Sequence, residues 1–307
     1  MPADGAFVDV EALCEFGSGE AGAGLEEFEE GQDAARGGGH SEILRESGPN
    51  PPGFAPTVLS MTTYVLVPGF WLGAWAWDAV AARLRADGHE VRAVTPLGIA
   101  ERATTAGTSA EDQVADIVSF LDATPHPVVL VGHSGAGPVV VAAAEKAREH
   151  VAHLVLVDTG PMPDGMAHID FHEPQTQEWI RARMAAHDGW YPIPDAAWMR
   201  ASGASLEGLD DDTLETMWAR ATAEPGGVVT GSAARGVNDP SLPKTLVASS
   251  FPAEQVRALA AAGVPAFVEL AGPEWDIRDL PTGHWPMLSE PDALAGVLQD
   301  VGAVTIM

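Results

Sequence analysis

The chain has 307 residues, of which 46% are hydrophobic, and it carries a formal net charge of −28. This length allows a large buried core, and no apolar run approaches the roughly 20 residues of a membrane helix. The strongly acidic balance speaks against nucleic acid and against an anionic membrane as partners.

The first 60 residues differ in composition from the rest. They hold 12 acidic and two basic residues with glycine-rich pieces, which predicts a disordered acidic tail. No positive n-region precedes an apolar segment, so a secretory signal is not expected. Cys14 is the single cysteine, so no disulfide can form within the chain and a cytoplasmic location is expected. Met61 directly precedes the first predicted strand, which is compatible with a start there.

From residue 61 onward, short runs of β-formers alternate with helical stretches. Strands are expected near 62–67, 90–94, 127–131, 153–157, 244–248 and 275–279. Helices are expected near 75–86, 110–123, 136–148, 253–262 and 291–300. This alternation predicts an α/β fold with a doubly wound, mostly parallel sheet of about six strands, covered on both faces.

The loop after the first strand contains glycine and large aromatic residues. Residues 67–75 read VPGFWLGAW. Gly69 allows the chain to turn, so that the backbone N–H of Phe70 can face the end of the sheet as an oxyanion donor. The alternative is an ordinary strand-to-helix loop whose glycines and tryptophans only pack.

The third predicted strand leads directly into a serine between small residues. Residues 132–136 read GHSGA, and an alanine- and valine-rich helical stretch follows. This is the nucleophile-elbow pattern, in which small neighbours avoid collisions at a tight turn. Ser134 is therefore the candidate nucleophile, and the N–H of Gly135 is the second candidate oxyanion donor. Ala136 stands where the pattern usually has glycine.

An aspartate ends the strand after the nucleophile helix. Asp158 follows the apolar run at 154–157 and is expected to face the rim where the carboxyl ends of the strands meet. The strand at 244–248 is followed by SSFP, without a carboxylate, and the nearest acid, Glu254, begins a helix. An acidic side chain in the first turn stabilises a helix, and this accounts for Glu254 without a catalytic role. Asp158 is the preferred acid of the site, and Glu254 is the alternative.

The stretch from 161 to 242 is too long for a simple crossover. It contains helical pieces near 175–186, 196–199 and 211–223. We interpret 161–242, called the insertion below, as a helical cap over a core formed by 61–160 and 243–307. Side chains expected to line an apolar substrate pocket are Trp71, His133, Met166, Trp190, Trp218 and Trp285. For each tryptophan and methionine of the insertion, the alternative is packing between its helices.

The last predicted strand is followed by the candidate base. His284 is the only histidine after position 187, and it lies in the loop TGHWPM at 282–287. The order serine, acid, histidine along the chain is the one used on this type of sheet. Asp279 lies in the strand before this loop and is not expected to reach the imidazole.

The segments VPGFWLGAW, GHSGAG and TGHWPM occur in an order that resembles the α/β-hydrolase superfamily. Within it, the chain is similar to the small serine esterases, a branch that also holds plant salicylate-ester hydrolases and hydroxynitrile lyases. The resemblance covers 61–307 and implies acyl transfer from a small ester. Relatives usually have His-Gly where this chain has Pro68-Gly69, and the lyases have lysine where this chain has Trp285.

Ester hydrolysis is thus the leading hypothesis, with a small-molecule ester as partner. The same triad also serves lactones, thioesters, C–C cleavage and perhydrolysis, and ligand receptors of this fold often retain it. No P-loop, EF-hand or Cys/His cluster occurs, so no metal or other cofactor is expected. His168 and His172 have i, i+4 spacing but lie among polar residues, and we do not expect them to hold a metal. A homodimer is compatible with the sequence.

Overall fold

The computed structural model describes residues 61–305, so the predicted acidic tail lies outside the described residues. Within them, six parallel strands form one sheet in the order β2-β1-β3-β4-β7-β8. The strands are β1 (Thr63–Val67), β2 (Glu90–Ala93), β3 (Val128–His133), β4 (Val151–Val157), β7 (Lys244–Ala248) and β8 (Trp275–Asp279). The predicted parallel sheet is therefore confirmed. β3 runs to His133, which brings the end of the strand directly to Ser134.

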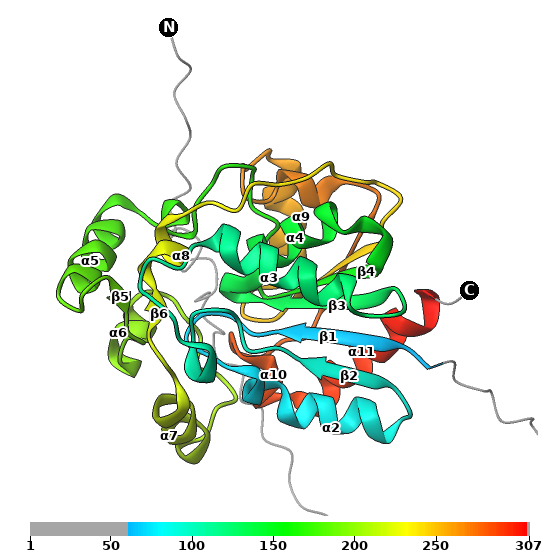
Figure 1. Cartoon of the computed structure of the whole chain (residues 1–307), viewed down its shortest axis with the longest axis horizontal. Helices are drawn as coiled ribbons and strands as arrows, with labels where there is room; N and C mark the ends of the chain where they lie inside the picture. The colour runs from blue at the N-terminus through cyan, green and yellow to red at the C-terminus, as the bar shows by residue number, and fades with distance from the viewer. Residues whose placement is uncertain (1–60, 306–307) are drawn as a thin grey trace, which may run out of the picture.

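The strands are buried on both faces, and their side chains alternate between two layers of helices. Val65, Leu130 and Leu154 pack under one layer, and Leu66 and Val131 under the other. Helices α3 (Ala110–Asp122), α4 (Gly137–Lys146) and α9 (Ala253–Ala261) cover the first face, and α2 (Asp78–Ala86) and α11 (Pro291–Thr305) cover the second (Figure 1).

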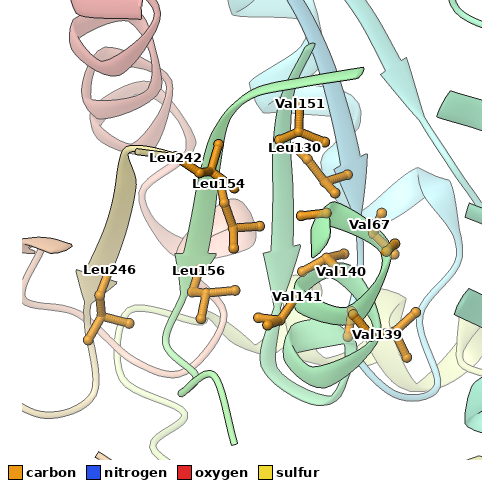
Figure 2. Packing of buried hydrophobic residues seen from close by; sticks show 14 of the residues in the cluster. Val67, Leu130, Val139, Val140, Val141, Val151, Leu154, Leu156, Leu242 and Leu246 are labelled. Atoms are coloured by element: carbon orange, nitrogen blue, oxygen red, sulfur yellow. The ribbon is translucent and has the colours of Figure 1, made fainter. Parts of the chain in front are cut away.

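The nucleophile helix packs on the first face through consecutive valines. Val139, Val140 and Val141 of α4 are each at most 2% exposed. Figure 2 shows them beside the leucines of β3 and β4. Because α4 cannot shift without opening this core, the start of the helix is fixed relative to the end of β3.

Several short helical turns were not predicted as separate elements from the sequence pattern. These turns are η1 (Ala74–Trp77), η2 (Ala100–Arg102), η3 (Ser134–Ala136), η4 (Arg148–His150), η6 (Val268–Ala271) and α10 (Pro286–Ser289). The predicted helix at 75–86 is η1 followed by α2, and the predicted helix at 136–148 ends at Lys146. Within 61–305, no helix is long and apolar enough to cross a bilayer.

The helices and short strands of the insertion lie at the end of the sheet toward which the strand arrows point, and its last residues run back along α4 to the start of β7 (Figure 1). Its elements are η5 (His168–Phe171), α5 (Pro174–Ala185), β5 (Trp190–Tyr191), α6 (Ala196–Ala201), α7 (Asp211–Arg220), β6 (Glu224–Pro225) and α8 (Gly226–Thr230). The antiparallel pair β5–β6 was not predicted, because strands of two residues leave no periodic signal. α7 ends at Arg220, earlier than the predicted 223.

Candidate active site

The serine turn follows β3 with strained backbone geometry. Ser134 has a φ of 48°, in the left-handed region that a residue with a side chain rarely adopts. A Cβ at Gly132 would overlap Val140 of α4, and one at Gly135 would overlap the ring of Phe70. The small residues around Ser134 are therefore required by packing. The strain indicates a functional turn, since it persists only where the surroundings hold it.

His284 joins the serine from the loop after β8. Its Nε2 lies 2.7 Å from Ser134 Oγ, and its Nδ1 lies 2.6 Å from Asp158 Oδ2. The backbone N–H of His284 donates to the carbonyl of Ser205 in the insertion at 2.9 Å. Side chains that directly follow β3 and β4 and one from the loop after β8 thus form one hydrogen-bonded chain at the carboxyl edge of the sheet.

Asp158 directly follows β4 with a φ of 49°, and its carboxylate is fully buried. Oδ1 accepts the backbone N–H groups of Ser249 at 3.0 Å and Ser250 at 2.9 Å, and Oδ2 also accepts the Ser250 hydroxyl at 2.6 Å. Burial alone would raise the pKa of this carboxyl. The hydrogen bond from His284 and its charge, with the Ser250 donors, outweigh burial and lower the pKa below its usual value.

The two serines were not predicted as site residues. A signal was nevertheless present in the sequence. Ser249 and Ser250 directly follow β7, the strand that neighbours β4 in the sheet. The hydrogen-bond donors of these two serines bind the carboxylate of Asp158, which follows the neighbouring strand β4.

The other two carboxylates considered from the sequence do not reach His284. Glu254 is exposed in the first turn of α9. Asp279 Oδ1 accepts the N–H of Ala253 at 2.7 Å and so caps the start of α9. Neither has a hydrogen bond to His284 in the part of the chain that the structure describes.

The loop after β1 reaches the serine turn from the other side. A Cβ at Gly69 would lie 2.8 Å from Ser134 Cβ and 2.9 Å from the His133 carbonyl oxygen, so only glycine fits there. The Phe70 ring packs against Gly135, and the Phe70 N–H makes no backbone hydrogen bond within 61–305. The two predicted oxyanion donors therefore belong to segments in direct contact.

His133 supports the loop that carries His284. Its Nε2 donates to the His284 carbonyl at 2.7 Å, which leaves Nδ1 as the unprotonated nitrogen, without a partner among the described residues. Burial, followed by the positive charge of His284, lowers the pKa of His133 to about 3, so the ring is neutral. The His133 side chain is 1% exposed and contacts the His284 loop. Its predicted contact with substrate stays a prediction.

The predicted pocket residues differ in their surroundings. Trp285 is buried beside the His284 ring, at 4.9 Å between centroids, and Trp71 is half-buried between Phe70 and Tyr191. Met166 is half-buried in the insertion. Trp190 lies in β5, and the Trp218 indole donates to the Pro194 carbonyl.

The hydrogen bond to Pro194 shows that Trp218 packs within the insertion. That the predicted pocket residues contact substrate stays a prediction. One surface hollow is lined by Trp75, Arg220 and neighbours, and a second by Met184, Gly226 and neighbours. Neither hollow includes a residue of the Ser134–His284–Asp158 chain.

His168 of η5 packs against the loop after β1. Its ring meets Phe70 at 4.4 Å and His172 at 5.4 Å between centroids. Burial is the main cause that lowers the pKa of His168 to about 3, so this imidazole is neutral. No group of three His, Cys, Asp or Glu side chains within the described residues is placed to hold a metal ion.

A sheet of this order, with a serine at the β3–α4 turn, defines the class of the protein. Residues 64–297 match the model of the alpha/beta hydrolase family. The match spans well over half of the chain, and the chain belongs to this family.

Similar proteins include a carbendazim hydrolyzing esterase from a Nocardioides species, 35% identical over 101 residues, which are 32% of this chain and 42% of the relative. Methylesterase 8 of Arabidopsis thaliana is 36% identical over 105 residues, 33% of this chain and 38% of the relative. The matched stretch spans less than half the length of these curated relatives.

Solved structures resemble the whole described core. An extracellular alpha/beta-hydrolase from a Paenibacillus species has a TM-score of 0.65 at 18% identity, covering 78% of this chain and 99% of that chain. A thermophilic esterase from Thermogutta terrifontis has a TM-score of 0.61 at 21% identity, covering 80% and 91%. At these identities the likeness shows the fold.

Proposed function

We propose that the protein is a serine hydrolase that cleaves a small carboxylic ester through an acyl-enzyme. The observation that carries this proposal is the continuous chain from Ser134 Oγ through the His284 imidazole to Asp158, with links of 2.7 and 2.6 Å. Both distances are within the range needed for proton transfer between a nucleophile, its base and an orienting acid. The names of the esterase relatives support the same reaction.

In this mechanism, Ser134 Oγ attacks the ester carbonyl while His284 Nε2 takes the hydroxyl proton. His284 returns that proton to the departing alkoxide, and water then attacks the acyl-enzyme with His284 again as base. The bond from the acyl group to Ser134 Oγ then breaks, the carboxylic acid leaves, and His284 returns the proton to Ser134 Oγ. Asp158 stays ionised, fixes the proton on Nδ1 and stabilises the imidazolium that forms. The N–H groups of Phe70 and Gly135 hold the oxyanion of each tetrahedral intermediate.

The substrate class follows from the aromatic surroundings of this chain and from the relatives. Phe70 and Trp71 lie in the loop that carries the proposed oxyanion donor, and Trp285 packs against the His284 ring. The insertion contacts this loop and acts as a cap over the site. An apolar or aromatic ester fits such surroundings. Because several relatives are methylesterases, methyl esters of small aromatic acids are the first substrates to assay.

The test compares hydrolysis of these methyl esters and of p-nitrophenyl acetate by the parent chain and by Ser134→Ala. We expect a burst of p-nitrophenol equal to the enzyme concentration in the parent and none in the variant. Turnover by Ser134→Ala within tenfold of the parent would refute the assignment of the nucleophile. A parent chain that binds esters without releasing alcohol would instead be a ligand receptor of this fold.

A further inference from the structure

The residue after the proposed oxyanion donor Phe70 has an unfavourable backbone conformation. Trp71 has a φ of 67°, in the left-handed region where bulky residues are outliers. A tryptophan keeps this geometry only if its surroundings hold it there. Since Trp71 shares a peptide bond with Phe70, whatever holds Trp71 also sets the direction of the loop that carries the Phe70 N–H.

The insertion supplies the hydrogen bonds that hold Trp71. The Trp71 N–H donates to Glu224 Oε2 at 3.1 Å, and the Trp71 carbonyl accepts the N–H of Thr222 at 2.9 Å. The indole N–H donates to the Tyr191 carbonyl at 2.9 Å. Tyr191 and Glu224 are cross-strand partners in the β5–β6 pair, so all three contacts come from one small unit of the insertion.

Glu224 is an unusual residue for this position. It is 1% exposed, and no Lys, Arg or His among the described residues forms an ion pair with it. Its other oxygen, Oε1, accepts Gln113 Nε2 at 3.4 Å. Burial raises the pKa of this carboxyl to about 7. An apolar side chain would avoid this burial penalty, which indicates that the acceptor itself is required.

From these contacts we infer that Glu224 is a positioning residue for ester hydrolysis. Its carboxylate fixes the Trp71 N–H, and through the Trp71 backbone it keeps the Phe70 N–H directed at the carbonyl oxygen of the substrate. The insertion thereby contributes to the oxyanion hole as well as covering the site. This inference rests on the proposed function.

The test uses the full chain with Glu224→Leu, which has no acceptor, and Glu224→Gln, whose amide oxygen can still accept the Trp71 N–H. The control pair is Glu215→Leu and Glu215→Gln, which change an exposed glutamate in α7 of the same insertion. We expect Glu224→Leu to lower kcat for a methyl ester ten- to a hundredfold with KM changed less than threefold. Glu224→Gln should lie between this variant and the parent, and the Glu215 variants should match the parent.

An aryl trifluoromethyl ketone reports on the oxyanion hole directly, because its serine adduct bears an oxyanion. Its affinity should fall by the same factor as kcat/KM along the series parent, Glu224→Gln, Glu224→Leu. A loss of kcat with unchanged ketone affinity would overturn the inference, as would a Glu224→Leu kcat within twofold of the parent. If Glu224→Leu does not fold, Glu224→Ala, which also lacks an acceptor for the Trp71 N–H, is judged by the same criterion.

Amide hydrogen exchange over residues 69–72 gives a readout that does not depend on catalysis. Exchange in this stretch should be at least tenfold faster in Glu224→Leu than in the parent and unchanged in Glu215→Leu. Unchanged exchange would refute the positioning role even if the protein is no esterase. Conversely, absence of ester turnover in the parent with the expected exchange difference would refute only the proposed function.

Discussion

Ser250 holds Asp158 twice, through its backbone N–H to Oδ1 at 2.9 Å and through its hydroxyl to Oδ2 at 2.6 Å. The second contact is made to the same oxygen that meets His284 Nδ1. The carboxylate is thus fixed from the β7 side while it receives the imidazole from the β8 side. Loss of the Ser250 hydroxyl should therefore loosen the acid without removing it.

Ser250→Ala tests this arrangement. We expect kcat to fall about three- to tenfold, since one charge-assisted hydrogen bond is lost while both backbone donors remain. Steady-state kinetics on one methyl ester measures the effect, with Ser119→Ala as the control because Ser119 bonds only within α3. A kcat equal to that of the control would show that the hydroxyl does not contribute to orienting the acid.

Asp158→Asn tests the acid. The amide cannot hold the imidazole tautomer that has a proton on Nδ1, so kcat should fall by roughly three to four orders of magnitude with the fold intact. Glu254→Gln should leave kcat unchanged. Its only expected effect is a loss of a few tenths of a kcal/mol of stability at the start of α9. Collapse of kcat in Glu254→Gln with an active Asp158→Asn would transfer the role to Glu254.

Gly135→Ala tests the contact between the serine turn and the loop after β1. The new methyl group would overlap the Phe70 ring, so the loop must move and kcat should fall at least tenfold. Gly296→Ala in α11 is the control, because a Cβ there meets no atom within 4 Å and alanine favours a helix by about 1 kcal/mol. Parallel measurements of kcat and Tm separate displacement of the loop from unfolding.

Glu224 makes stability depend on pH in a definite direction. Burial raises the pKa of Glu224 from 4.5 to about 7, so the folded state binds this proton more tightly than the unfolded state. The stabilisation from the protonated form is complete below pH 4.5 and is lost as pH rises through 7. Relative to Glu224→Gln, the parent should thus lose up to about 3 kcal/mol of unfolding free energy across this window.

Urea unfolding at a series of pH values measures that difference, with Glu215→Gln as the matched control. A difference between the parent and Glu224→Gln that does not change between pH 4.5 and 7 contradicts the buried carboxyl described above. A difference that grows in the opposite sense would mean that the ionised form is stabilised, by a partner that the described contacts do not contain.

The sheet could be predicted from the sequence because each strand is a short run of β-formers followed by a turn. Parallel strands place their carboxyl ends on one edge, so Ser134, Asp158 and His284 were expected near one another although 150 positions separate Ser134 from His284. The structure brings these three side chains together. Asp158 was preferred because it ends a buried strand, and its contact with His284 agrees with that placement.

The contacts from the insertion could not be predicted in the same way. The two-residue strands β5 and β6 have no periodicity, and Glu224 looks like an ordinary surface glutamate between Ala223 and Pro225. Its burial results from the way the insertion folds back onto Trp71, which is a tertiary contact between positions 153 apart in the chain. Local sequence patterns carry no information on such a contact.

The most direct test of the account is labelling with a fluorophosphonate, followed by peptide mapping of the modified residue. The phosphonyl group should be found on Ser134 in the parent, at one group per chain. Labelling should be lost in Ser134→Ala and slowed strongly in Asp158→Asn. Labelling of a different residue, or an active esterase that resists the reagent, would contradict the proposal that Ser134 forms the acyl-enzyme.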